Sequence, residues 1–359
     1  MEKKNQVPKY PPLRFPEFTD EWTQTTIGEI CKVSTGEMNT QDKIEDGMYP
    51  FYVRSSKIER ANRYTYDGVA ILTPGDGAIG QIFHYSKGKI AVHQRVYMLT
   101  EMQCIPKYLF HCFSARFFGR VNRMSAKNTV DSVRMNMITD MPIPLPSLPE
   151  QRKIAALLSL IDERIEVQNA IIKEQEVAKT LLSKELLIPE NDWTEYAVRD
   201  CLTYEQPAKY LVKHTDYSSD STLTPVLTAN KGFILGYTSE QGIYQKGACI
   251  IFDDFTLDCK YVPFAFKVKS SAIKILQARK GFDIRFMFEV IKSLSLSPFA
   301  HKRHYISEVE PIKVLVPSFA KQEKIARLFA ALDERLAVEK EYATLLQKQK
   351  AYLLQQMFV

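Results

Sequence analysis

The residues with the clearest chemical potential in this chain of 359 residues are basic side chains that gather in four segments. Two segments lie in the first half: Arg54, Lys57, Arg60 and Arg63, near Tyr52 and Tyr64; and Lys107, Arg116, Arg120, Arg123, Lys127 and Arg134, with Asn128, Thr129 and Ser132 among them. Two lie in the second half: Lys260, Lys267, Lys269, Lys274, Arg279 and Lys280, with no acid between them; and His301, Lys302, Arg303, His304 and Tyr305. Lysine and arginine neutralise phosphates, and Arg, Lys, Asn and Gln also read base edges in the major groove. The pattern predicts binding to nucleic acid, with solvated surface charge as the alternative.

Sixteen residues are our candidates for contact with DNA: Arg54, Lys57, Arg60, Arg63, His93, Arg95, Arg123, Lys127, Asn128, Arg134, Lys231, Lys260, His301, Lys302, Arg303 and His304. Arg54, His93, Arg95 and Asn128 are the candidates for reading bases. His93 and Arg95 lie in a strand pattern, whose alternation would point both side chains to one face. The net charge of +6, from 48 basic and 42 acidic residues, permits binding to nucleic acid but does not establish it.

Motifs for catalysis are missing from the sequence. Gly88-Lys89 is followed by Ile90 and has no glycine five residues upstream, which excludes a phosphate loop. The Asn/Asp-Pro-Pro-aromatic motif of adenine methyltransferases and a glycine-rich S-adenosylmethionine turn are also absent. Asp254 with Asp258-Cys259-Lys260 only weakly resembles the end of a nuclease site. We therefore expect no catalytic residue in this chain.

Metal sites and disulfides also have little support. His301 and His304 lack further metal ligands nearby in the sequence. The six cysteines contain no C-x-x-C pair, so the sequence favours reduced thiols in a cytoplasmic protein over a disulfide framework or a zinc site. The apolar runs are far shorter than the ~18 residues of a membrane span, and the N-terminus lacks an apolar signal segment.

The elements that must position the basic segments are arranged in a tandem repeat. Gln151 and Gln322 lie in matching segments at an offset of 171 residues, and Pro146/Pro317 precede them in the same register. The match continues without a gap through Asp162-Glu163-Arg164 and Asp333-Glu334-Arg335. The two tryptophans, Trp22 and Trp193, share this offset. Such agreement predicts a duplication of roughly 170 residues.

Each copy ends in a segment with a helical period. Leu158, Ile161, Ile165 and Ile172 mark one face of the first segment, which contains no Gly or Pro between Pro149 and Pro189. The second segment runs from about Lys321 to the C-terminus. Each helix would be roughly 57 Å long at 1.5 Å per residue. A stripe of this length cannot be buried against one small domain, so we expect the helices to pair with each other, antiparallel. A dimerisation arm is the alternative.

Each copy begins with a domain in which strands precede a helix. Residues 69–73 and 90–99 are predicted strands around the turn Pro74-Gly75-Asp76-Gly77, followed by a helix at 106–118. In the second copy, strands at 248–252 and 261–268 enclose the turn Asp253-Asp254, and a helix follows at 284–294. The predicted fold class is α+β, with two α/β domains at 1–145 and 189–316 and two long helices at 146–188 and 317–359, related by a pseudo-twofold axis.

This layout resembles the specificity subunit of type I restriction–modification systems. The resemblance rests on Leu13-Arg14-Phe15-Pro16-Glu17-Phe18 before Trp22, on Ile27-Gly28-Glu29-Ile30, and on the duplicated P-x-x-x-Q-x-x-I motif. The second copy departs modestly, with Ala320-Lys321 in place of Pro149-Glu150. The resemblance covers essentially the whole chain, and it implies two target-recognition domains that each read one half of a split DNA sequence.

The resemblance also implies two methyltransferase subunits around the helices, with restriction subunits in the full complex. S-adenosylmethionine, ATP and Mg would belong to those partners. The candidate partner contacts are the repeated helix residues Gln151, Ile154, Asp162, Arg164, Gln322, Ile325, Asp333 and Arg335. The implied outcome is adenine N6 methylation of host DNA, or cleavage of unmodified DNA. A stand-alone nuclease and a coiled-coil adaptor without DNA binding remain the alternative functions.

Overall fold

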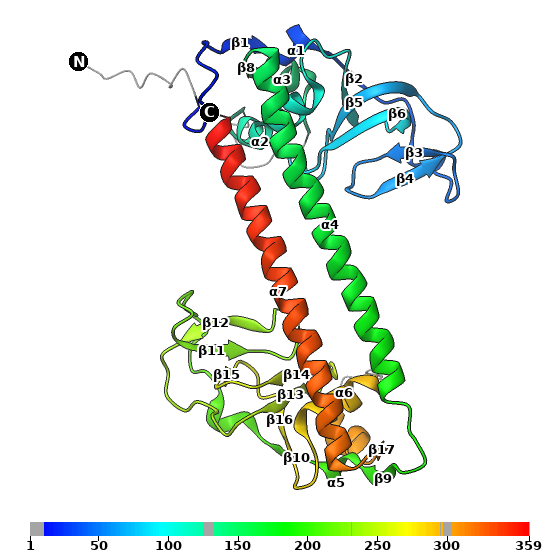
Figure 1. Cartoon of the computed structure of the whole chain (residues 1–359), viewed down its shortest axis with the longest axis vertical. Coiled ribbons are helices and arrows are strands. Elements are labelled where there is room, and N and C mark those ends of the chain that lie inside the picture. Colours follow the sequence, from blue (N-terminus) through cyan, green and yellow to red (C-terminus); the bar gives the residue numbers. More distant parts are fainter. Residues whose placement is uncertain (1–10, 125–131, 231, 295, 297–302, 359) are drawn as a thin grey trace, which may run out of the picture. The chain divides into compact units, whose positions relative to one another are not determined.

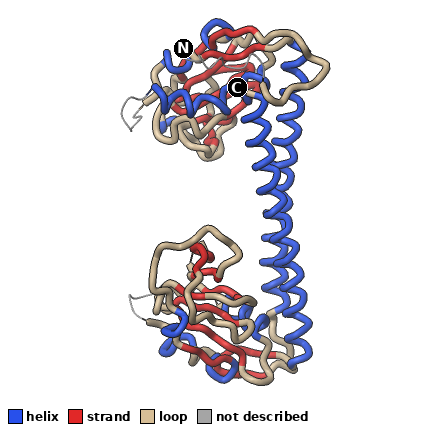
Figure 2. The backbone as a smooth tube through the Cα atoms, turned by 90° about the vertical axis from the view of Figure 1, so that its left-hand side faces the viewer, coloured by secondary structure: helices blue, strands red, loops and turns tan. Residues whose placement is uncertain are grey.

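A computed structural model describes residues 11–124, 132–230, 232–294, 296 and 303–358 (Figure 1). The chain divides into two compact units, Met1–Asn169 with Glu341–Val359, and Ala170–Lys340. We call them unit 1 and unit 2. Each contains a strand-rich domain and half of each long helix (Figure 2). None of the helices in the described residues is long and apolar enough to cross a membrane.

Unit 1 is built on a six-stranded sheet with the order β2-β7-β5-β6-β3-β4. Its strands are β2 (Lys32–Thr35), β3 (Tyr49–Tyr52), β4 (Ile58–Ala61), β5 (Tyr66–Pro74), β6 (His84–Val92) and β7 (Val96–Thr100). Neighbouring strands are antiparallel except β3 and β6. A separate antiparallel pair joins β1 (Thr23–Thr26) to β8 (Pro142–Leu145). The helical elements are α1 (Ile27–Ile30), η1 (Thr40–Asp42), α2 (Pro106–Met124) and α3 (Met135–Thr139).

Unit 2 repeats this order with a different sheet arrangement. A four-stranded sheet has the order β10-β16-β13-β14, a three-stranded sheet the order β12-β11-β15, and β9 pairs with β17. The strands are β9 (Thr194–Ala197), β10 (Leu202–Glu205), β11 (Thr224–Leu227), β12 (Ile234–Thr238), β13 (Cys249–Asp253), β14 (Cys259–Val262), β15 (Lys267–Val268), β16 (Ile273–Ala278) and β17 (Lys313–Val316). The helical elements are α5 (Val198–Cys201), η2 (Pro207–Tyr210), α6 (Ile284–Ser293) and η3 (Tyr305–Val309).

Two predictions of a single continuous strand were wrong, because each segment forms two strands. The strand expected at residues 90–99 is two strands, because a turn at Gln94 and Arg95 lets Val96 N–H donate to the His93 carbonyl at 2.9 Å. The strand expected at 261–268 divides into β14 and β15, which belong to different sheets. Pro263 follows the last residue of β14 and cannot donate a ladder hydrogen bond.

The two long helices are confirmed as α4 (Leu148–Leu186) and α7 (Phe319–Met357), with 39 residues each. In unit 1, Asp162 pairs with Lys350 and Arg164 donates to the Tyr342 hydroxyl, so the two helices run antiparallel there. In unit 2, Glu176 pairs with Lys340 and Lys179 pairs with Asp333, so the helices run antiparallel there too. The predicted antiparallel pairing is therefore confirmed within each unit.

The duplication is visible in the hydrogen bonds of both units. Thr23 lies opposite Leu145 in the β1–β8 ladder, and Thr194 lies opposite Val316 in the β9–β17 ladder, at the same offset. The ion pair Asp162–Lys350 likewise becomes Asp333–Lys179 when both residues are shifted by 171. Residues that are equivalent in the sequence repeat therefore make equivalent contacts in the two units.

The departure at Glu150 and Lys321 also has a structural reason. In unit 1, buried Glu150 accepts from Arg14 Nε at 2.7 Å and from Trp22 Nε1 at 3.2 Å. In unit 2, Lys321 pairs instead with Glu190 at 2.6 Å and its ammonium lies 5.8 Å from the centre of the Trp193 ring. In each copy, the tryptophan therefore contacts a charged residue at the start of the long helix. That residue is acidic in unit 1 (Glu150) and basic in unit 2 (Lys321).

Candidate nucleic-acid interface

In unit 1, two exposed arginines meet at one aspartate in the turn after the central strand β5. Asp76 Oδ2 accepts from Arg95 Nη1 at 2.8 Å and from Arg54 Nη1 at 3.3 Å. The Arg54 and Arg95 side chains are 48% and 63% exposed, whereas that of Asp76 is 15% exposed. A single carboxylate oxygen thus accepts one N–H group from each guanidinium, and each guanidinium keeps further N–H donors for other contacts.

The charges fix the protonation of this cluster. Burial acts to raise the pKa of Asp76, but the hydrogen bond from Arg95 and the charge of Arg54 outweigh it and lower that pKa. Burial and the charge of Arg54 lower the pKa of His93. Asp76 is therefore ionised and His93 neutral at pH 7.

His93 contacts the backbone of Arg95 on one side of its ring and Thr40 of η1 on the other. The structure corrects its expected position, since His93 and Arg95 occupy a tight turn rather than one face of a strand. His93 Nδ1 accepts from the backbone N–H of Arg95 at 3.0 Å, which places the proton of the neutral ring on Nε2. Nε2 lies 3.4 Å from Thr40 Oγ1. His93 is buried, but it lines a cavity of about 550 Å³ together with Arg54, Asp76 and Lys43.

The chain that follows α2 returns to the same turn. Val133 N–H donates to the Gly75 carbonyl at 2.7 Å, and the Tyr97 hydroxyl donates to the Val133 carbonyl at 2.9 Å. Arg134 comes next and is exposed. Unit 2 has the equivalent contact, in which His304 N–H donates to the Asp254 carbonyl at 3.0 Å. In both units, the segment after the domain helix is attached to the turn after the central strand.

In unit 2, the aspartate of this turn is buried and has a structural role. Asp254 Oδ1 accepts from the backbone N–H groups of His304 and Tyr305, at 3.1 and 2.7 Å. Its Oδ2 lies 3.5 Å from Lys274 Nζ and 4.0 Å from Arg303 Nη1. Asp254 and Lys274 are each 1% exposed. The weak resemblance to a nuclease site is therefore explained as an internal ion pair, and no group of metal-ligating residues occurs in the described parts of the chain.

Most described residues of the predicted DNA surface lie on the outside of their units. The exposed ones are Arg54, Lys57, Arg60, Arg63, Arg95, Arg123, Arg134, Lys260 and Arg303. Lys127, Asn128, Lys231, His301 and Lys302 lie outside the described residues. The prediction was wrong for His304, which is 0% exposed because it is enclosed beside Asp254. Lys267 and Lys274, counted in a basic segment, are also buried, with Lys267 Nζ donating to the Gln241 carbonyl at 2.6 Å.

Four predicted partner contacts on the helices were also wrong, because their side chains are buried in their own unit. Gln151 Oε1 accepts from Ile105 N–H at 2.9 Å, and its Nε2 donates to the Pro146 carbonyl at 2.8 Å. Gln322 makes the equivalent bonds, with Asp283 N–H and the Pro317 carbonyl, both at 2.9 Å. Ile154 and Ile325 pack in the domain cores. The duplicated motif therefore attaches each domain to its long helix.

The other four helix candidates lie nearer the surface. Asp162 and Asp333 are part-exposed and paired with lysines of the opposite helix. Arg164 and Arg335 are exposed. Their contact with a partner stays a prediction.

Asp76 is the residue that our sequence reasoning missed. Its segment was recognised only as a turn. The signal was present, because Asp76 is an acid at the end of a buried strand in a domain with basic segments on either side.

Comparison with known proteins agrees with this geometry. A family model described as the type I restriction modification DNA specificity domain matches residues 19–176. The match covers somewhat less than half of the chain. The resemblance found in the sequence is thereby confirmed, and the contacts repeated at the 171-residue offset extend the same architecture to the second copy.

Curated relatives match parts of the chain. The Escherichia coli type I restriction enzyme EcoR124I/EcoR124II specificity subunit is 44% identical over 154 residues, which are 38% of this chain and 38% of the relative. The Escherichia coli EcoDI specificity subunit is 27% identical over 154 residues, 43% of this chain and 34% of the relative. The matched region thus spans about two fifths of these relatives or less.

Solved structures match the fold over nearly the whole chain. The S subunit of a type I restriction–modification system from M. genitalium has a TM-score of 0.71 and 18% identity, covering 98% of this chain and 99% of that one. A chain from a structure of a type I R-M system has a TM-score of 0.53 and 14% identity, covering 94% and 97%. At these identities the similarities show the fold alone, which this chain shares with the S subunit from M. genitalium.

Proposed function

We propose that this chain is the DNA-specificity subunit of a type I restriction–modification complex, in which each strand-rich domain reads one part of a split target. The observation that carries the proposal is a repeated scaffold with different polar surfaces. The helices and their ion pairs repeat at one offset, whereas the turn after the central strand holds an exposed arginine pair in unit 1 and a buried lysine in unit 2. Repeated helices and ion pairs with different domain surfaces suit the reading of two different sequences.

The cluster at Asp76 supplies a specific mode of reading. Arginine recognises guanine through two parallel hydrogen bonds to O6 and N7. Such recognition requires a guanidinium held in a fixed orientation, and Asp76 provides this for Arg54 and Arg95. His93 Nε2 already lies 3.4 Å from Thr40 Oγ1, so contact of His93 with a base stays a prediction. Lys57, Arg63 and Arg134 would contact phosphates and so contribute affinity without sequence preference.

The long helices offer a surface for partner subunits. Leu160, Val167 and Leu181 recur on α4 in multiples of seven residues, and Val338, Leu345 and Tyr352 do so on α7; each is more than half exposed. These stripes are distinct from the buried seam that contains Leu158, Ile161 and Leu346. An exposed heptad stripe is typical of a helix that packs against further helices.

The stripes are related to each other by the duplication. Val167 and Val338 are equivalent, as are Leu181 and Tyr352. Two equivalent stripes suit two copies of one partner, which we propose to be the methyltransferase subunits. S-adenosylmethionine, ATP and Mg would be bound by the methyltransferase and restriction subunits, and this chain would direct their adenine methylation or DNA cleavage.

Exchange of one domain tests the proposal. Residues 1–145 are replaced by the same region of another specificity subunit, and methylated adenines are mapped in the host genome by single-molecule sequencing. One half of the recognised sequence should change and the other should stay. A change in both halves, or in neither, would refute the division of labour. Cleavage of DNA by the purified chain with Mg²⁺ alone would instead favour the nuclease alternative.

A further inference from the structure

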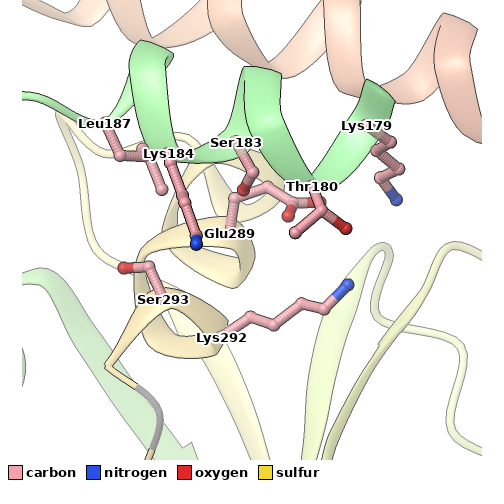
Figure 3. A pocket seen from close by; sticks show the side chains of 8 residues that line it. All are labelled: Lys179, Thr180, Ser183, Lys184, Leu187, Glu289, Lys292 and Ser293. Atoms are coloured by element: carbon pink, nitrogen blue, oxygen red, sulfur yellow. The ribbon is translucent and has the colours of Figure 1, made fainter. Parts of the chain in front are cut away.

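A cavity of about 370 Å³ lies in unit 2 between the last turns of α4 and helix α6 (Figure 3). Lys179, Thr180, Ser183, Lys184 and Leu187 line it from α4, and Glu289, Lys292 and Ser293 from α6. Its volume falls within the range of small-molecule sites, about 300–1,000 Å³. None of these residues belongs to the predicted DNA surface or to the exposed apolar stripes.

The cavity lining contains a buried acceptor that lacks a donor. Glu289 is 1% exposed; its Oε1 accepts from Arg285 Nη2 at 2.7 Å, but its Oε2 is buried without a hydrogen-bond partner in the described structure. The Thr180 hydroxyl donates to the Glu176 carbonyl at 2.9 Å, so its oxygen can act as a further acceptor. A buried carboxylate oxygen without a partner is costly, so Glu289 Oε2 requires a donor.

The lining also offers positive charge. Lys184 and Lys292 are exposed and their ammonium groups lie at the cavity (Figure 3). The ion pairs found in the described residues include neither of them. Lys179 also lines the cavity, but it is already paired with Asp333. Two lysines without acidic partners suit an oxyanion.

Unit 1 provides an internal comparison, because the same place is occupied there by side chains of the protein itself. The position equivalent to Ser183 is Leu354, which packs against the core of unit 1. The position equivalent to Leu187 is Phe358, which is buried with its ring 5.6 Å from that of Tyr108. Lys184 corresponds to Gln355.

The domain helices can be aligned as well, since Gln151 and Gln322 bind Ile105 and Asp283 at their starts. In this alignment, Ser114 of α2 is the residue equivalent to Lys292 of α6. The copy that is filled by apolar groups thus lacks the two lysines, and the copy with the cavity has them.

We propose that this cavity is a binding site for a nucleoside phosphate. An amino or hydroxyl group of the ligand donates to Glu289 Oε2, the phosphate lies between Lys184 and Lys292, and Leu187 with the lysine stems contacts the apolar face of the base. The class follows from the combination of a buried acceptor that requires a donor, two lysines that suit an oxyanion and a size beyond that of inorganic phosphate. The site is independent of target reading, so it can be tested without DNA or partner subunits.

The test is calorimetric titration of the full chain with AMP, with adenosine and inorganic phosphate as half-ligands. AMP should bind saturably with one site per chain, and each half-ligand should bind at least tenfold more weakly. Ser183→Leu places the unit 1 residue in the cavity and should abolish binding. Lys184→Gln and Lys292→Ser, also taken from unit 1, should each weaken AMP binding by roughly tenfold, the size expected for one charge-assisted hydrogen bond.

Lys173→Gln is the matched control, because Lys173 is an exposed lysine of α4 that does not line the cavity. It should leave AMP affinity unchanged. Thermal unfolding of each variant checks that unit 2 is intact, and the exposed Lys184→Gln keeps the test decisive where Ser183→Leu does not fold. Absence of AMP binding at millimolar concentration, or equal binding by wild type and Lys184→Gln, overturns the proposal. If a single-stranded oligonucleotide competes with AMP, the natural ligand is a nucleotide of a nucleic-acid strand. If it does not compete, the natural ligand is a free nucleotide.

Discussion

Gln322→Leu should release the strand-rich domain of unit 2 from its helix. Gln322 is 2% exposed and its Oε1 accepts from the backbone N–H of Asp283, the residue that caps α6. Its Nε2 donates to the carbonyls of Pro317 at 2.9 Å and Gly281 at 3.3 Å. Leucine has a similar volume but no polar atom, so the substitution removes these bonds without opening a large cavity.

The cost follows from the groups that are left without partners. Each buried donor or acceptor deprived of its partner costs about 1–3 kcal/mol. With Asp283 N–H and the Pro317 carbonyl as the two main losses, we expect unit 2 to lose about 2–6 kcal/mol. For a unit of this size, about 2–4 °C of melting temperature is lost per kcal/mol. The transition of unit 2 should therefore fall by roughly 4–24 °C.

Differential scanning calorimetry of the full chain measures this shift. Gln151→Leu removes the equivalent bonds in unit 1, so the two variants together assign the transitions to the units. Gln322→Glu keeps the acceptor for Asp283 N–H but loses the amide donor, and should give an intermediate loss. Gln347→Leu, at an exposed position of α7, is the control. A shift below about 2 °C for Gln322→Leu would refute the role of this motif in holding the domain.

Four further predictions concern binding, specificity and pH. Asp76→Asn should reduce the preference for one guanine in one half-site by roughly tenfold, the order expected for one bidentate arginine contact; an unchanged methylation pattern would contradict it. Arg134→Ala should weaken binding to all sequences and lower the slope of log affinity against log salt by about one; a loss confined to one sequence would contradict phosphate contact. Burial lowers the pKa of His111 from 6.5 to about 4, although the negative charge of Asp162 opposes this shift. The stability of unit 1 should therefore be complete above pH 6.5 and should fall by up to about 3 kcal/mol as the pH drops to 4. His111→Gln should remove this loss. Four residues inserted after Gln168 add about 6 Å to α4. We expect the unread DNA spacer between the half-sites to become longer by roughly one or two base pairs, at about 3.4 Å each. An active mutant with the original spacer would contradict this.

The sequence predicts the long helices well because their signal is local and extended. The apolar period persists over 39 residues, and Pro189 marks the end of α4. Strand boundaries are harder to predict, because a turn needs only two residues. Residues 90–99 alternate like one strand, yet the chain reverses at Gln94 and Arg95.

Burial of charged residues could not be predicted from the sequence. Lys274 lies in a basic segment, but its partner Asp254 is brought to it by the pairing of β13 with β16. His304 is enclosed for the same reason, through backbone bonds to Asp254. A similar limit applies to Gln151 and Gln322. Their repetition shows that they matter, but only the structure shows that their partners are inside the chain.

The repeated ion pairs explain why the helices of the two copies resemble each other more than the domains do. Several helix positions have a charged partner on the other helix, and Asp162–Lys350 in unit 1 has its counterpart in Asp333–Lys179 in unit 2. A change at one of these four residues breaks a pair unless the opposite helix changes as well. Residues such as Arg54 and Arg95 have no such counterpart, because their fixed contact is Asp76 in the same domain. Recognition surfaces can therefore change one domain at a time, while the paired helices can change only together.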